Sequence, residues 1–273
     1  MSRFSPLLII LPFFSFSLLA QDSTDVYEEP ILYHEYSECL REIFNAADSI
    51  KAESSEATEI HYLKENRLNC EQSSPVSRRI SLRYLEWGDT VYDDKGVKED
   101  VDKKELFKEG LMWGRIAVEE DTLNHLNYEN LSMGFAAVIS VSGLKGKANM
   151  ADSVRIFAEK AIMLDPRNDR AYHILGRWHY EVSKLSWFTR MLSRVIFGES
   201  PKGSFERAIN YFEQAIKLDN IAVHRYWLGM AYLESGNKEE ALEQFTILQT
   251  LPLVQHNDQY FKDEAKKLID KHG

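Results

Sequence analysis

The sequence predicts an all-α fold in which antiparallel helix pairs stack side by side. Its 273 residues include only 7 Pro and 13 Gly, few for a chain with many strand turns, and good helix formers are plentiful. Hydrophobic residues make up 44% and charged residues 28%, which suits a folded chain. A large residue followed by glycine recurs at Trp87-Gly88, Met133-Gly134, Leu175-Gly176 and Leu228-Gly229. This recurrence indicates a repeat protein.

Residues 1–20 have the layout of a cleaved secretory signal. Arg3 precedes the apolar run Leu7–Phe14, and Ala20 precedes a polar stretch. We therefore expect cleavage after Ala20 and an exported protein, either periplasmic or secreted. The alternative is a membrane anchor formed by an uncleaved N-terminal segment.

Residues 21–75 are expected to form a degenerate N-terminal hairpin. Its first helix is marked by apolar residues at helical spacing and its second, weaker helix by a shorter set: Leu40, Ile43, Phe44, Ala47 and Ile50, then Ile60, Leu63 and Leu68. Cys39 and Cys70 are the only cysteines, and they could form a disulfide or remain two buried thiols.

Residues 76–253 are expected to hold four repeats with insertions, each with the large-Gly pair on its first helix. The second helices carry small residues at matching places: Gly110, Gly114 and Ala117, Val154, Ala158 and Ala161, Ala208 and Ala215, and Ala241 before Phe245. Gly134, Gly176 and Gly229 follow Ala117, Ala161 and Ala215 by 17, 15 and 14 residues, close to the spacing of a tetratricopeptide repeat. The predicted fold is therefore a tetratricopeptide-like right-handed superhelix.

Helix ends are marked by Asp165-Pro166 and by Leu218-Asp219-Asn220. After the last repeat, residues 254–273 carry Phe261, Leu268 and Ile269 on one face and charge on the other, which predicts a C-terminal capping helix.

From about Pro75 onward the chain resembles the regulator of microtubule dynamics family. The phrase LGRWHYEVSKLSW at 175–187 and the turn FGESP at 197–201 carry the resemblance, because a general repeat requires neither. The resemblance implies a helical-repeat fold and, in animal members, association with microtubules or organelle membranes. It implies no catalytic residues, and a bacterial-type exported member is expected.

Charge and motifs narrow the functional classes. The formal net charge of -10 disfavours nucleic-acid binding, which needs a basic surface. The chain lacks the GxSxG, HExxH, P-loop and GxGxxG motifs, and neither its cysteines nor its histidines have metal-site spacing. We therefore expect no enzyme, cofactor or metal, and predict a scaffold that binds a protein or peptide.

The predicted binding surface is the concave groove of the array. First-helix positions expected to face it are Arg170, His173, Arg177, Tyr180 and Glu181, then Tyr226, Met230 and Leu233. Arginine and tyrosine contribute strongly at interfaces, so this mixture suits an extended peptide. The alternative for each residue is packing against a neighbouring helix.

A second candidate surface is the insertion 184–197, which is rich in large apolar and basic residues. Trp187, Phe188, Met191 and Arg194 could contact a membrane or a partner, and packing against the array is the alternative. A peripheral membrane protein and, with less support, an enzyme with a site in the groove are the competing functions. The oligomeric state is left open.

Overall fold

The computed structural model describes residues 36–90, 92–93, 96–97, 101–185, 202–255 and 257–273. Within these ranges the chain forms eleven helices and a hairpin of strands β1 (Tyr92–Asp93) and β2 (Gly96–Val97), which pair antiparallel. The helices are α2 (Glu38–Glu53), α3 (Glu56–Asn66), α4 (Ser74–Thr90), α5 (Lys103–Glu120), α6 (His125–Ser140), α7 (Leu144–Leu164), α8 (Asp169–Lys184), α10 (Phe205–Leu218), α11 (Ala222–Glu234), α12 (Lys238–Thr250) and α13 (Asp258–His272). Among them, none is both long and apolar enough to cross a membrane.

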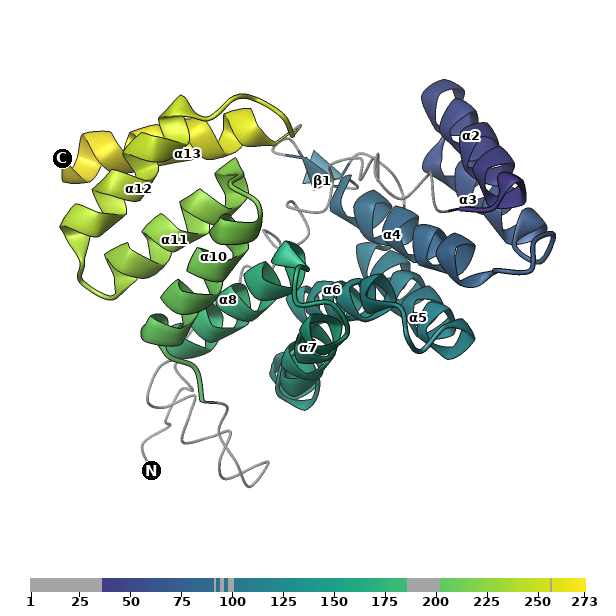
Figure 1. The fold of residues 1–273 in the computed structure, drawn as a ribbon, viewed down its shortest axis with the longest axis horizontal. Helices are drawn as coiled ribbons and strands as arrows, with labels where there is room; N and C mark the ends of the chain where they lie inside the picture. Colours follow the sequence, from purple (N-terminus) through teal and green to yellow (C-terminus); the bar gives the residue numbers. More distant parts are fainter. Residues whose placement is uncertain (1–35, 91, 94–95, 98–100, 186–201, 256) are drawn as a thin grey trace, which may run out of the picture.

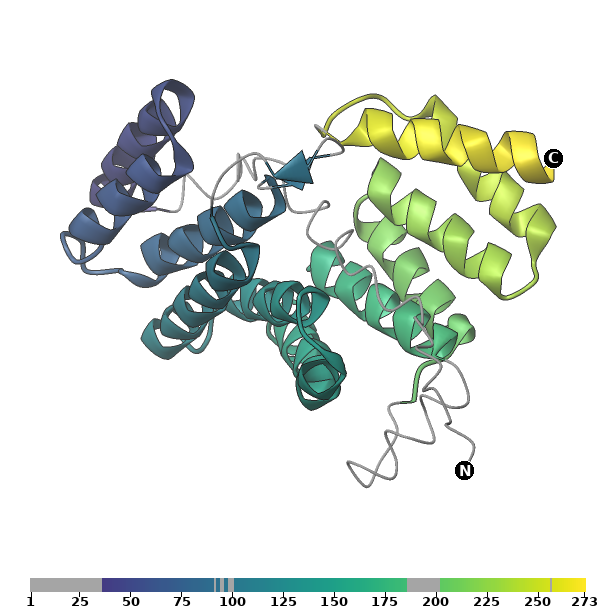
Figure 2. The same ribbon diagram turned by 180° about the vertical axis from the view of Figure 1, so that it is seen from behind.

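The helices form an arch of stacked pairs. Consecutive helices pair as α2–α3, α4–α5, α6–α7, α8–α10 and α11–α12, and α13 packs against α11 and α12. The chain follows the arch from α2, through α6 and α7, to α13 at the other end (Figures 1 and 2). The first helices α4, α6, α8 and α11 also contact one another from pair to pair. The predicted all-α superhelix with a capping helix is confirmed.

The glycines of the large-Gly pairs let a phenylalanine ring of the second helix lie against the backbone of the first. A Cβ atom on Gly229 would lie 2.4 Å from Cε1 of Phe245. The same contact joins Gly88 with Phe107 at 2.4 Å and Gly176 with Phe212 at 2.6 Å. Any side chain at these three positions would overlap the ring, which explains why glycine recurs there.

The pair α6–α7 departs from this arrangement. Ala158 of α7 stands where Phe212 stands in α10, three residues before the last small residue of the helix, so no ring fills the space beside Gly134. Gly134 instead faces the preceding pair, and an added Cβ would lie 3.2 Å from the Cα of Leu111 in α5. Here glycine permits close approach between repeats rather than within one.

Three second helices end in the same way. The backbone N–H groups of Asp121, Asp165 and Asp219 donate to the carbonyl oxygens of Ala117, Ala161 and Ala215, at 3.1, 2.9 and 2.8 Å. The carboxylates of Asp121 and Asp165 then accept from backbone N–H groups two residues later, at 3.0 and 2.9 Å. The helix ends predicted at Asp165 and Asp219 agree with α7 and α10, which end at Leu164 and Leu218.

The N-terminal pair α2–α3 is fastened by a disulfide. Cys39 and Cys70 are bonded, with their Cα atoms 5.9 Å apart, so of the two expectations for the cysteines the structure has the disulfide. Buried Leu40, Ile43 and Leu63 fill the space between this pair and α4. The sequence predicts that Leu68 continues the second helix, but α3 ends at Asn66 and Leu68 is 72% exposed.

Replacing Gly229 with alanine tests the ring contact. Alanine is intrinsically better than glycine in a helix by about 1 kcal/mol. Overlap with Phe245 costs roughly 1–3 kcal/mol beyond that gain, because the ring has to move. We expect a lower free energy of unfolding in urea, followed by circular dichroism, and partial recovery when Phe245→Leu is added.

Gly143→Ser is the matched control. A Cβ on Gly143 meets nothing within 4 Å, and the N-cap of α7 has no side-chain hydrogen bond. Serine there should leave stability unchanged or raise it slightly. Equal losses in Gly229→Ala and Gly143→Ser would contradict the importance of the ring contact.

Candidate functional site

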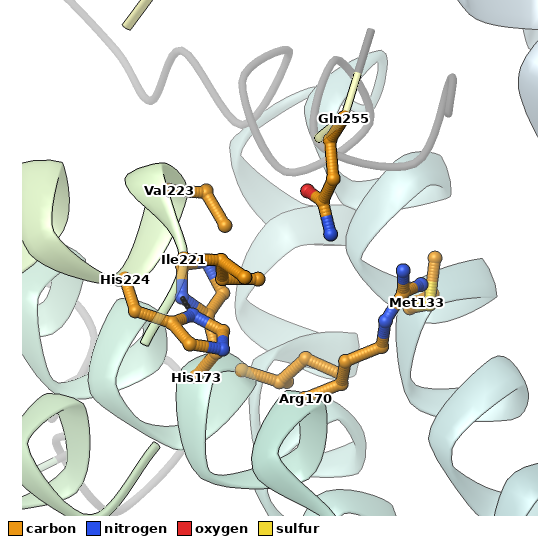
Figure 3. A pocket seen from close by; sticks show the side chains of 8 residues that line it. Met133, Arg170, His173, Ile221, Val223, His224 and Gln255 are labelled. Atoms are coloured by element: carbon orange, nitrogen blue, oxygen red, sulfur yellow. Dashed lines mark hydrogen bonds between the residues drawn. The ribbon is translucent and has the colours of Figure 1, made fainter. Parts of the chain in front are cut away.

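An open hollow lies where α6, α8 and α11 meet the connection between α12 and α13. The space between its walls, counted together with the open solvent at its mouth, is about 440 Å³. We call it the central hollow. Its lining residues come from α6, from the first two turns of α8, from the start of α11 and from the connection. They are Met133, Arg170, His173, Ile174, Ile221, Val223, His224 and Gln255. Figure 3 shows these side chains converging from several elements.

The N-terminus of α8 is held in place by Asn168. Its Oδ1 accepts the backbone N–H of Ala171 at 2.8 Å, which caps the helix. Its Nδ2 donates to Oε2 of Glu129 in α6 at 2.8 Å and lies 2.9 Å from Nδ1 of His125. One side chain therefore starts α8 and joins it to α6, which places Arg170 and His173 at the hollow.

A histidine pair joins α8 to α11. Nδ1 of His173 lies 3.0 Å from Nδ1 of His224, and Nε2 of His224 lies 3.0 Å from Oδ2 of Asp169. Burial alone would raise the pKa of Asp169, but the hydrogen bond and charge of His224 hold it below its usual value. The Nε2–H of His224 can donate to Asp169, and one proton lies between the two Nδ1 atoms, so at least one of the two rings is neutral. Burial and the charge of His224 lower the pKa of His173, which favours His173 as the neutral ring.

Arg170 is the charged side chain of the hollow. Its side chain crosses from α8 to Met133 of α6 (Figure 3). Its charge also acts on Glu129: burial raises the pKa of the Glu129 carboxyl, and Arg170 opposes part of that rise. Glu129 is 6% exposed and lies behind the lining residues.

Arg177 lies one turn beyond His173 and is buried. Its guanidinium carbon is 3.3 Å from the ring centroid of Trp227 in α11, and its Nη2 donates to Oε1 of Glu181 at 3.4 Å. Burial raises the pKa of Glu181, and the charge of Arg177 opposes this rise. Arg177 is 0% exposed, so it holds α8 against α11 rather than facing solvent.

The remaining predicted groove residues are buried or half-buried. Tyr180 is 1% exposed and packs against Trp227, with ring centroids 5.4 Å apart. Tyr226 is also buried and packs against Phe261 of the capping helix at 5.1 Å. Met230 and Leu233 are half-buried beside the same core. Tyr180 and Tyr226 thus lie where a partner cannot reach much of either ring.

The second predicted surface lies outside the described residues. Trp187, Phe188, Met191 and Arg194 belong to 186–201, which the structure does not describe, so contact of the insertion 184–197 with a membrane or partner stays a prediction. Residues 1–35, with the expected signal peptide, also lie outside.

Six of the lining residues are not among the predicted groove residues: Met133, Ile174, Ile221, Val223, His224 and Gln255. Repeat spacing identifies which residues share a helix face within one repeat. It does not predict the contact of His224 with His173, because these residues belong to two neighbouring repeats. Gln255 belongs to a connection without repeat periodicity. Among the described side chains, no group of three His, Cys, Asp or Glu residues could hold a metal ion.

Comparisons with known proteins agree on fold and family. The family model described as Regulator of microtubule dynamics protein 1-3 matches residues 43–273. Regulator of microtubule dynamics protein 1 of Bos taurus is 25% identical over 95% of this chain and 81% of its own length. The Homo sapiens protein of that name is 26% identical over 62% of this chain and 54% of its own length, so the match spans about half of that relative.

A solved structure supports the fold alone. A thermophilic TPR protein of Thermus thermophilus superposes with a TM-score of 0.57, over 84% of this chain and 98% of that chain, at 16% identity. The tetratricopeptide-like architecture predicted from the repeat spacing is confirmed.

The His173 environment predicts a pH dependence of stability. Burial, together with the charges of His224, Arg177 and Arg170, lowers the pKa of His173 well below its usual value of about 6.5. Below about pH 6.5 His173 becomes protonated in the unfolded chain but stays neutral in the folded chain. The free energy of unfolding therefore falls as the pH falls. The stability of wild type relative to His173→Gln should fall by up to ~1.4 kcal/mol per pH unit.

The measurement is urea unfolding of both proteins between neutral and mildly acidic pH. Subtracting the variant removes the contributions of the carboxylates that titrate in the same range. His61→Gln is the control, because His61 is 72% exposed and pairs with Glu65 in the same helix. The stability difference between wild type and His173→Gln should change with pH more than the difference between wild type and His61→Gln. Equal changes would contradict the lowered pKa of His173.

Proposed function

Because the chain belongs to the regulator of microtubule dynamics family and has a tetratricopeptide-like fold, we propose that it is a non-enzymatic scaffold that binds a protein or peptide in the central hollow. The observation that carries the proposal is the hollow itself, which is open and combines apolar walls with a few polar groups. Ligand sites in proteins commonly combine apolar walls with a few placed polar groups.

The chemistry of the lining supports binding rather than catalysis. Among the described residues, the lining side chains include no hydroxyl, thiol or carboxylate group. Asp169 and Glu129 lie close by, but Asp169 is hydrogen-bonded to His224 and Glu129 to Asn168. A side-chain nucleophile would need such a group facing the ligand. The imidazoles of His173 and His224 also line the hollow, and they are hydrogen-bonded to each other and to Asp169.

A photo-crosslinking residue at Met133 tests this function. We expect it to capture a partner in the native compartment, whereas the same residue at Ile156, 49% exposed on α7 and away from the hollow, should not. With the partner purified, Met133→Glu should weaken binding about tenfold or more by placing a charge in the hollow, and Ile156→Glu should leave it unchanged. Equal capture at both positions would exclude the hollow as the binding site.

We also propose that the protein is exported. The N-terminal pattern of Arg3, the apolar run and Ala20 supports this, and so does the Cys39–Cys70 disulfide, since disulfides persist in oxidising compartments. The relatives are named for microtubule dynamics. An exported chain does not meet cytoplasmic tubulin, so the partner proposed here is a protein outside the cytoplasm.

N-terminal sequencing and thiol labelling test the export proposal. The mature protein from the native cell should begin at Gln21, and both cysteines should resist alkylation until a reductant is added. An intact Met1 together with two reactive thiols would contradict export. The disulfide joins cysteines 31 residues apart, so Cys39→Ser with Cys70→Ser should lower stability by about 3–4 kcal/mol.

A further inference from the structure

The C-terminal end of the array is attached to the preceding repeats mainly at one junction. We call α11, α12 and α13, residues 222–272, the C-terminal unit. It packs on the rest of the described array chiefly through α11, which contacts α8 and α10. In a repeat array each unit is stabilised by its own contacts and by those with its direct neighbours, so a terminal unit can open while the others stay folded. The contacts of α11 with α8 and α10 therefore control the opening of this unit.

Two contacts at this junction keep the same protonation state between about pH 5 and 7. Trp227 of α11 lies over the guanidinium of Arg177, 3.3 Å from its carbon to the ring centroid, and packs against Tyr180 at 5.4 Å between centroids. Arginine stays protonated in proteins, and burial raises the pKa of Tyr180 further above that range. These contacts hold the unit closed at both ends of the range. The contact between His173 and His224 is different, because histidine titrates within it.

The His173–His224 contact excludes one proton. The two Nδ1 atoms are 3.0 Å apart, and a hydrogen bond between them needs one N–H and one lone pair. Both rings therefore cannot be protonated while the contact lasts. Nε2 of His224 lies 3.0 Å from Oδ2 of Asp169, so a carboxylate is in place to stabilise one charged ring. The closed junction accommodates a first added proton and excludes the second.

The surroundings of the pair make its rings hard to charge. Burial lowers the pKa of His173, and the charges of His224, Arg177 and Arg170 lower it further. From α10, the ring of Phe212 lies 5.4 Å from that of His173 and offers no charge. The charged and titratable groups that face the pair or its immediate neighbours are Asp169, Arg170 and Arg177 of α8, Asp219 before α11 and Glu129 of α6.

The carboxyl groups near the junction do not produce opening in mild acid. Burial raises the pKa values of Asp219 and Glu181, so these groups bind protons more readily in the closed unit than in an open one. They therefore favour the closed unit as the pH falls. The pKa of Asp169 is held below its usual value, so this carboxylate stays charged. Opening in mild acid would thus have to come from the histidines.

We infer that the His173–His224 contact is a proton-sensitive joint, which mild acid opens so that the C-terminal unit separates from α8 and α10 while the preceding repeats stay folded. In the open state both rings can be protonated below about pH 6.5, so that state binds one proton more than the closed state. The ratio of open to closed molecules then rises up to about tenfold for each pH unit.

Opening would also take the central hollow apart. One part of its lining belongs to α6 and α8, and the other belongs to the start of α11 and to the connection after α12. Figure 3 shows the two histidines side by side where these parts meet. On the scaffold function proposed above, a partner held by both parts would be released in acid. The joint itself does not depend on that function.

Amide hydrogen exchange followed by mass spectrometry tests the joint on the intact protein without any ligand. Exchange is measured from about pH 7.5 to about pH 5, and each rate is divided by the intrinsic rate of the same amide at that pH. We expect protection in α11, α12 and α13 to fall by up to about tenfold per pH unit below about pH 6.5. Protection in α4, α5 and α6 should change much less.

Variants assign the response to the pair. His173→Gln should flatten it, because an amide oxygen can accept the Nδ1–H of a protonated His224 and no proton is then excluded. His179→Gln is the matched control: it makes the same change on α8 at another buried histidine, whose ring stacks on Tyr211 of α10, and it should keep the response. Asp169→Asn removes the carboxylate that stabilises the first proton, so the response should become steeper.

The outcomes are distinct. Equal loss of protection in the C-terminal unit and in α4 to α6, or a response that survives His173→Gln, would overturn the joint. Should His173→Gln open the unit at every pH, Asp169→Asn decides: a steeper response supports the joint and an unchanged one overturns it. Failure of partner capture at Met133 would instead remove the scaffold function and leave the joint intact.

Discussion

The close approach of paired helices at glycine is the constraint on which the rest of the structure depends. In three of the repeats a phenylalanine ring occupies the space that a Cβ atom would fill, at Gly88, Gly176 and Gly229. This contact sets the distance and rotation of the second helix relative to the first. Because each pair buries only part of its apolar surface, the next pair must cover the remainder. The inner layer of α4, α6, α8 and α11, and therefore the central hollow, follows from this stacking.

Buried polar contacts then select how the repeats join. Asn168 connects α8 to Glu129 of α6, and the His173–His224 contact connects α8 to α11. A buried polar group costs free energy unless it is hydrogen-bonded, so a displaced repeat would lose these partners as well as its apolar contacts. The pKa of His173 is lowered mainly by burial. A second proton between the two rings would break the hydrogen bond that joins α8 to α11, so protonation and this contact oppose each other. The hollow is thus bounded by groups that already hold the array together.

The repeat spacing predicted the helix pairs because it depends on contacts within one pair, a few turns apart in sequence. It predicted the groove less well, since several neighbouring elements decide which side chains remain accessible. Arg170 and His173 are predicted at the groove and they line the hollow. The sequence places Tyr180 on the same face, but α8 packs so closely on α10 and α11 that Phe205 and Trp227 cover its ring.

By itself, the sequence determined the all-α class, the helix pairs around the four glycines, the helix ends at Asp165 and Asp219 and the capping helix. Each of these rests on local geometry: helical period, small residues at close contacts and caps at helix ends. Only the tertiary structure decided that Cys39 meets Cys70, that His224 meets His173 and that Gln255 and Arg170 line one hollow. These contacts join residues far apart in the chain, and their distances follow from the way neighbouring helices and repeats pack rather than from any local pattern.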